Sequence, residues 1–141
     1  MFTSEQSLYN LAVRAIEQEL VPALRHLGIG LIAYSPLHAG LLTGVLATAE
    51  TAPGMDRAPK ACEQLKCYEA LCVELGATPT QVALAWVLSN PVTSTAIVGP
   101  ATMAQLDADL DALATHLEPA TMHALDEIFP GPGEAPQSYA W

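Results

Sequence analysis

A continuous apolar run over residues 29–34, Ile-Gly-Leu-Ile-Ala-Tyr, constrains the fold more than any other part of the chain. A β-strand without alternating polar residues is typical of a parallel sheet whose two faces are both covered. Ser35 and Pro36 follow the run and would end the strand. A second β-prone run covers residues 94–98, and residues 6–10 have the composition of a strand end. We therefore expect about three strands in one parallel sheet.

The segments between these strands carry helical periodicity or none. Apolar residues at intervals of three and four predict a helix over about residues 13–27, which Gly28 would end. Residues 37–59 are rich in Gly, Ala, Thr and Pro without a period, so they predict a long loop with a helical turn near residues 41–46.

Two capping boxes mark further helix starts. Thr78 with Gln81 begins a helix that reaches about residue 88, and Thr102 with Gln105 begins another. A helix that starts at Glu118-Pro119 is the last one expected. Three apolar helical faces are predicted: Leu65, Tyr68, Leu71, Cys72 and Leu75, ended by Gly76; Leu106, Leu110, Leu113 and Leu117; and Met122, Leu125 and Phe129.

The order of these elements predicts an α/β fold. Strands that alternate with helices imply a parallel sheet joined by helical crossovers. Three such strands do not close a barrel, and they leave two unpaired edges made of apolar residues. The same edges predict self-association, or pairing with another segment or chain.

Composition narrows the classes of function. The chain has 141 residues, of which 51% are hydrophobic and 14% charged, so we expect one well-buried domain. A net charge of -10 argues against binding to nucleic acids and anionic membranes. No apolar run reaches the roughly 20 residues that a membrane span requires, and the amino end has no signal-peptide pattern, so a cytoplasmic location is expected.

The cysteines, histidines and tryptophans predict no metal site. Cys62, Cys67 and Cys72 match neither a metal knuckle nor a disulfide framework and are expected to be packing thiols. Trp86 lies in the most apolar helix and is expected in the core. Tyr139 and Trp141, in the turn-rich tail of residues 131–141, would either close a pocket or form a flexible end. His38 is expected to be a solvated loop residue, and surface positions are expected for His26, His116 and His123.

Several motifs, in register over nearly the whole chain, resemble the aldo-keto reductase family. They are QSLYNL at 6–11, GIGLIAYSPL at 28–37, GLLTG at 40–44, TPTQVALAW at 78–86 and IVGP at 97–100, followed by Gln105-Leu106. The resemblance implies one partial domain, residues 1–141, which is the C-terminal part of a TIM (β/α)8 barrel from its sixth strand to the carboxyl end. The nicotinamide cofactor NADP(H), with NAD(H) as an alternative, would then bind at the mouth formed by the strand ends.

The resemblance also assigns cofactor-binding residues. Gln6 would lie beside the nicotinamide amide, and Tyr34 would stack on the nicotinamide ring. Ser35, Pro36 and Leu37 would line the pyrophosphate path, where a hydroxyl and approachable backbone N–H groups suit an anion.

A second set of residues would bind the adenosine 2'-phosphate. Helix N-termini favour phosphate, and Gly99, Pro100, Ala101, Thr102 and Gln105 occupy the matching loop and first turn. Ala101 stands where many relatives have arginine or serine. Asp109 replaces an adenine-contacting asparagine, although Asp107, Asp109 and Asp111 otherwise suggest a solvated helix face. Asp107 and Asp109, with no basic residue nearby, should disfavour the dianionic 2'-phosphate of NADP, so a weakened preference for NADP over NAD is predicted.

The family reduces aldehydes and ketones with a tyrosine general acid supported by lysine, aspartate and histidine. No segment of this chain matches those motifs, so no catalytic residue is assigned, and we expect no turnover by this chain alone. A carbonyl substrate would bind only in a complete barrel. The alternatives are a non-catalytic dinucleotide-binding module, a protein-pairing module, or a half barrel that pairs with its own copy.

Overall fold

The computed structural model describes residues 2–47 and 59–133. Its strands β1 (Ser4–Leu8), β2 (Gly30–Tyr34) and β3 (Thr93–Ile97) form one parallel sheet in the order β1-β2-β3, so the predicted α/β architecture is confirmed. Strand β1 begins two residues before the segment predicted from sequence, and β3 begins one residue before it.

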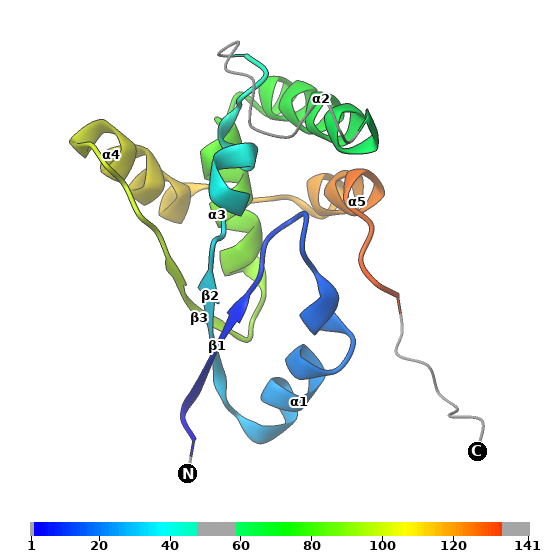
Figure 1. Cartoon of the computed structure of the whole chain (residues 1–141), viewed down its shortest axis with the longest axis vertical. Helices are drawn as coiled ribbons and strands as arrows, with labels where there is room; N and C mark the ends of the chain where they lie inside the picture. Colours follow the sequence, from blue (N-terminus) through cyan, green and yellow to red (C-terminus); the bar gives the residue numbers. More distant parts are fainter. Residues whose placement is uncertain (1, 48–58, 134–141) are drawn as a thin grey trace.

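Helices connect and cover these strands (Figure 1). Helix α3 occupies the centre, α2 and α5 lie side by side at one end, and α4 projects on the side away from α5. The α-helices are α1 (Leu20–Leu27), α2 (Pro59–Leu75), α3 (Pro79–Ser89), α4 (Met103–Asp111) and α5 (Pro119–Ile128), and the 3-10 helices are η1 (Ala15–Glu17), η2 (His38–Thr43) and η4 (Ala112–Ala114).

The single helix predicted over residues 13–27 is wrong. The segment is divided into η1 and α1, and α1 begins only at Leu20. Pro22 explains the break, because proline lacks an N–H group and its ring clashes with the preceding turn, so it is tolerated only near a helix start. Gly28 ends α1 in the left-handed conformation, with φ 65°, as the sequence predicts.

Strand β2 is buried on one face only, which corrects the prediction that both faces are covered. Leu31 and Ala33 are fully buried against the helices. Tyr34, on the other face, keeps 39% of its surface exposed, and its partner in β3, Ile97, keeps 45%. In the part of the chain that the structure describes, no second layer covers that face.

Helix α3 is the centre of the core. Residues Val82 to Val87 are all buried, including Trp86, as expected from the apolar run. The Thr78 hydroxyl accepts the Gln81 backbone N–H, and the Gln81 side chain accepts the Thr78 N–H at 2.8 Å, so the capping box is confirmed. Tyr68 in α2 donates its hydroxyl to the Pro79 carbonyl, which joins α2 to the first turn of α3.

We expect Thr78→Ala to lower the free energy of unfolding by about 1 kcal/mol, because the orphan N–H of Gln81 loses its acceptor. Thr78→Ser retains the hydroxyl and is the matched control, with a loss of less than about 0.5 kcal/mol. Urea unfolding of both variants provides the measurement. Equal losses in the two would show that the cap contributes nothing at this helix.

The periodicity of the fourth helix is misleading. Helix α4 ends at Asp111, and Leu110 and Leu113 are 52% and 71% exposed instead of buried. Its capping box, Thr102 with Gln105, is confirmed. The last helix follows the prediction, since Leu125 and Phe129 are buried and Met122 packs against the core.

Some of the cysteines and histidines lie at the surface and others are buried or half-buried. Cys72 is a buried packing thiol, and burial raises its pKa to about 11. Cys67 is exposed and Cys62 is half-buried, so the prediction of packing thiols holds only for Cys72. His26, His116 and His123 are exposed as predicted. His38 is half-buried instead of solvated, and burial lowers the pKa of its imidazole. Tyr139 and Trp141 lie outside the described residues.

No single helix in the described ranges is long and apolar enough to cross a membrane. Residues 61–75 of α2 and helix α3 together have the length and apolar composition of a span, but they are bent by 93° relative to each other, and residues 82–87 of α3 are buried within the protein.

Candidate functional site

A cleft of about 740 Å³ lies at the carboxyl ends of β2 and β3. Its walls come from η2 and the first turn of α3 on one side, and from the loop after β3 and helix α4 on the other. In parallel α/β folds this edge of the sheet is where ligands bind. We call it the strand-end cleft, and its lining residues are Tyr34, Ser35, Pro36, Leu37, Ala39, Gly40, Thr43, Thr80, Ile97, Val98, Gly99, Pro100, Gln105, Ala108 and Asp109.

Most of the cofactor residues suggested by the family resemblance meet in this cleft. They are Tyr34, Ser35, Pro36, Leu37, Gly99, Pro100, Gln105 and Asp109. Ala101 and Thr102 are exposed in the loop that leads to α4 and do not line it. Gln6 is exposed in the middle of β1, opposite Ile32 of β2, and also lies outside the lining.

The backbone after β2 is held in an uncommon shape. Ser35, His38 and Ala39 have φ values of 51°, 49° and 53°, in the left-handed region that residues with a side chain rarely adopt. The Ser35 carbonyl accepts the His38 N–H at 3.0 Å, and the Leu37 carbonyl accepts the Gly40 N–H at 3.0 Å. Strain of this kind persists only where surrounding contacts hold it, and it is common at functional sites.

The loop after β3 is closed by the side chain of Gln105. Its Oε1 accepts the Ala101 N–H at 2.7 Å and the Thr102 N–H at 3.3 Å. The Thr102 hydroxyl in turn accepts the Gln105 N–H at 3.2 Å. The Gln105 side chain therefore already accepts the N–H groups of Ala101 and Thr102, and a phosphate oxygen would have to replace it to bind them.

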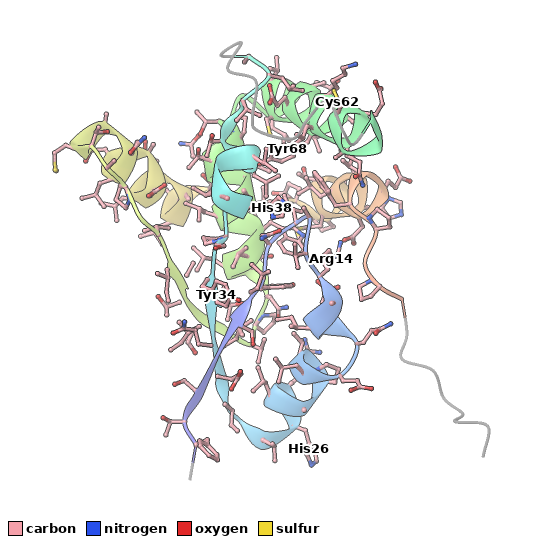
Figure 2. All side chains as sticks on the ribbon, in the orientation of Figure 1. Arg14, His26, Tyr34, His38, Cys62 and Tyr68 are labelled. Carbon is pink, nitrogen blue, oxygen red and sulfur yellow. The ribbon has the colours of Figure 1, made fainter. Side chains whose placement is uncertain are left out.

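Tyr34 and Ile97 provide an apolar surface at the mouth of the cleft. The two residues are paired in adjacent strands, so their side chains share one face of the sheet. Both are partly exposed, and Tyr34 is the last residue of β2 (Figure 2). An aromatic ring beside an aliphatic side chain is suited to stack on a planar heterocycle.

The cleft has an acidic character. Asp109 lines it and is half-buried, and burial raises the pKa of its carboxyl. Asp107 and Asp111 are exposed on the same helix, as expected of a solvated face. Neither lysine nor arginine is among the described residues that line the cleft.

Some lining residues were not assigned from sequence. Gly40 and Thr43 belong to the GLLTG motif, Thr80 to a capping box and Ile97 to the IVGP motif, so each carried a signal that was not interpreted as binding. Ala39 and Ala108 carried none, because an alanine in a loop or a helix has no chemistry that marks a site.

Metal binding finds no support in the described ranges. They contain no group of three or more His, Cys, Asp or Glu residues that could hold an ion.

A parallel α/β sheet with helical crossovers and a cleft at its strand ends fits part of a (β/α)8 barrel. The sequence model of the aldo/keto reductase family matches residues 2–129, and the chain belongs to that family. It is 44% identical over 143 residues to an uncharacterized oxidoreductase, YrpG, of Bacillus subtilis, covering 98% of this chain and 44% of that protein.

Other relatives are more distant. An NADH-specific methylglyoxal reductase of Escherichia coli is 32% identical over 133 residues, covering 87% of this chain and 40% of that protein. A putative voltage-gated potassium channel subunit beta of Schizosaccharomyces pombe is 30% identical over 142 residues, covering 89% of this chain and 41% of that protein. The chain therefore spans less than half the length of these relatives.

Proposed function

We propose that this chain supplies the cofactor cleft of an NAD(P)(H)-dependent aldo-keto reductase, as one partial barrel domain that runs from the sixth strand to the carboxyl end. The observation that carries the proposal is the convergence of residues from β2, β3 and α4 on the strand-end cleft. Tyr34 and Ile97 would contact the nicotinamide ring, and Ser35 to Leu37 would follow the pyrophosphate.

The residues present fit a dinucleotide in shape and chemistry. The volume of about 740 Å³ lies in the range of about 300–1,000 Å³ typical of small-molecule sites. The apolar pair at one end suits an aromatic ring. A phosphate oxygen would take the place of Gln105 Oε1 as the acceptor of the Ala101 N–H in the loop before α4. Gln6, Ala101 and Thr102 remain proposed contacts, although they do not line the cleft.

When bound, the cofactor would supply the hydride that reduces a carbonyl carbon. This chain's residues would bind and orient it, with Tyr34 stacked on the ring. The other described tyrosines, Tyr9 and Tyr68, are buried and donate their hydroxyls to Glu17 and to the Pro79 carbonyl. Burial raises the pKa of both hydroxyls, which opposes proton transfer. We propose that the general acid and the substrate pocket belong to residues outside this chain, and that the chain alone does not turn over. The free thiols support a reducing, cytoplasmic location.

We expect the chain to bind NADH, and Tyr34→Leu to weaken that binding about tenfold, because stacking on an aromatic ring is worth about 1–3 kcal/mol. Titration followed by NADH fluorescence measures the dissociation constant. Phe2→Leu removes an aromatic ring that is 86% exposed and lies outside the cleft, and it should leave the constant unchanged. Absence of binding by the wild-type chain would reject the proposal, and equal effects of the two variants would reject the role of Tyr34.

A second candidate function is protein pairing. The order β1-β2-β3 leaves one edge of β1 and one of β3 unpaired among the described strands, and Tyr34 and Ile97 lie on an uncovered face. Such edges favour addition of further strands, from a second copy or from another chain. Size-exclusion chromatography with light scattering tests pairing between copies of this chain. A defined dimer supports such pairing, and a monomer argues against it.

A further inference from the structure

Asn10 is a buried polar residue next to the strand-end cleft. It lies two residues after the end of β1, has 0% exposure and does not line the cleft. Its Oδ1 accepts the N–H groups of Ala12 at 3.0 Å and Val13 at 2.9 Å, which closes the local turn. Its Nδ2 donates to the Ser35 carbonyl at 2.9 Å, across 25 residues of sequence. A buried amide with this many partners has little freedom to move.

The hydrogen bond from Asn10 is made to Ser35, a cleft residue whose backbone conformation is restricted. Ser35 combines a φ of 51° with a following proline, and the residue before a proline has restricted backbone conformations. Its carbonyl accepts two donors, Asn10 Nδ2 and the His38 N–H at 3.0 Å. The orientation of the peptide group between Ser35 and Pro36 is therefore defined by a donor from the segment after β1 and by a donor from η2.

We infer that Asn10 is a positioning residue, which holds the Ser35–Leu37 backbone in the shape that binds a dinucleotide. This role rests on the proposed function, because it assumes that the cleft binds a dinucleotide. The hydrogen bond between Asn10 and Ser35 does not depend on that assumption. Without the Nδ2 donor, Ser35 loses one of the two contacts that oppose its strain, and the wall of the cleft relaxes.

Asn10→Ser separates the two tasks of the side chain. A serine hydroxyl still accepts backbone N–H groups two or three residues ahead, but it is too short to reach the Ser35 carbonyl. Asn90→Ser is the matched control. Asn90 likewise accepts a nearby N–H, from Val92 at 3.2 Å, and donates its Nδ2 across the fold, to the Tyr9 hydroxyl at 3.1 Å, yet it lies outside the strand-end cleft.

NADH titration of the folded variants, at a temperature where circular dichroism shows both to be fully folded, gives the first readout. We expect the dissociation constant to rise about fivefold in Asn10→Ser, which corresponds to about 1 kcal/mol, and to stay within about twofold in Asn90→Ser. Equal changes in the two variants overturn the inference, because they would indicate general destabilisation.

Hydrogen exchange of the His38 amide gives a readout that requires no cofactor. The amide should exchange about fivefold faster in Asn10→Ser than in the wild-type chain, because its acceptor is no longer held. Unchanged exchange overturns the inference. If the wild-type chain does not bind NADH, the proposed function fails while this measurement still decides the role of Asn10. If Asn10→Ser does not fold, slow exchange of the Asn10 side-chain amide protons in the wild-type chain supports the inference, and rapid exchange contradicts it.

Discussion

Replacement of Arg14 by methionine should lower the free energy of unfolding by about 2–3 kcal/mol, the largest loss that we expect from a single charge change in this chain. The guanidinium binds Glu17 through two nitrogens at 2.9 and 3.0 Å. Its Nη1 donates to Asp126 at 2.6 Å and to the Phe129 carbonyl at 2.7 Å, so it joins the segment after β1 to α5 (Figure 2). The side chain is only 12% exposed and lies over the Trp86 ring, with its guanidinium carbon 4.9 Å from the ring centroid.

The loss of stability arises mainly because Arg14→Met leaves the partly buried Glu17 carboxylate without its cation. Burial lowers the pKa of Arg14, but hydrogen bonds to Glu17 and Asp126 outweigh it and raise the pKa overall. Methionine retains packing against Trp86 and leaves Glu17, whose side chain is 21% exposed, without its cation. Glu17 would then keep only the Tyr9 hydroxyl, which donates to it at 2.8 Å. Asp126 is 52% exposed, so water can solvate its carboxylate in the variant. The expected loss in the free energy of unfolding is therefore smaller than for a fully buried pair.

Lys66→Met is the matched control for Arg14→Met. Lys66 forms an ion pair with Glu63 at 2.8 Å, but the two side chains are 58% and 70% exposed. Exposed pairs of this kind contribute little, so we expect a change of less than about 0.5 kcal/mol. Urea unfolding followed by circular dichroism compares the two variants. Equal effects would mean that the Arg14 contacts do not stabilise the fold.

The double substitution Ala101→Arg with Asp109→Asn should shift the ratio of NADPH to NADH affinity about thirtyfold toward NADPH, or about 2 kcal/mol. The wild-type chain should not prefer NADPH, because Asp109 lines the cleft and the described lining contains no base. A guanidinium at position 101, in the loop before α4, would pair with a dianionic 2'-phosphate, and asparagine would remove the opposing carboxylate.

The matched control for this pair of changes is Ala120→Arg. It adds the same charge at an exposed position in the first turn of α5, away from the cleft. Fluorescence titrations with both cofactors should show no change in the affinity ratio for it. Repeating them at higher salt should reduce the gain of the double variant, since exposed charges are screened. A strong NADPH preference in the wild-type chain would contradict the electrostatic argument.

Features defined by neighbours in sequence were predicted well. The capping boxes at Thr78 and Thr102, the end of α1 at Gly28 and the buried run of α3 all depend on residues within a turn or two. The helix predicted over residues 13–27 is wrong because Pro22 interrupts the periodic segment and confines α1 to Leu20–Leu27. The stripe through Leu110 and Leu113 failed because periodicity describes an apolar face without showing what covers it.

The cleft was anticipated only as a set of family positions. The resemblance named Tyr34 to Leu37 and Gly99-Pro100, and the fold brings both sets to the strand-end cleft. Their geometry could not be predicted, because the shape after β2 depends on Asn10, which is 25 residues away from Ser35.

From the amino-acid sequence alone come the element types, their capped ends, the parallel α/β class and the family resemblance, because each depends on local backbone chemistry or on short motifs. Tertiary structure decides which charges and faces are buried. Arg14 meets Asp126 across 112 residues, Asp109 becomes half-buried beside the cleft, and Tyr34 faces an uncovered side of the sheet. Burial and electrostatic pairing are sums over distant segments, and only the folded chain brings those segments together.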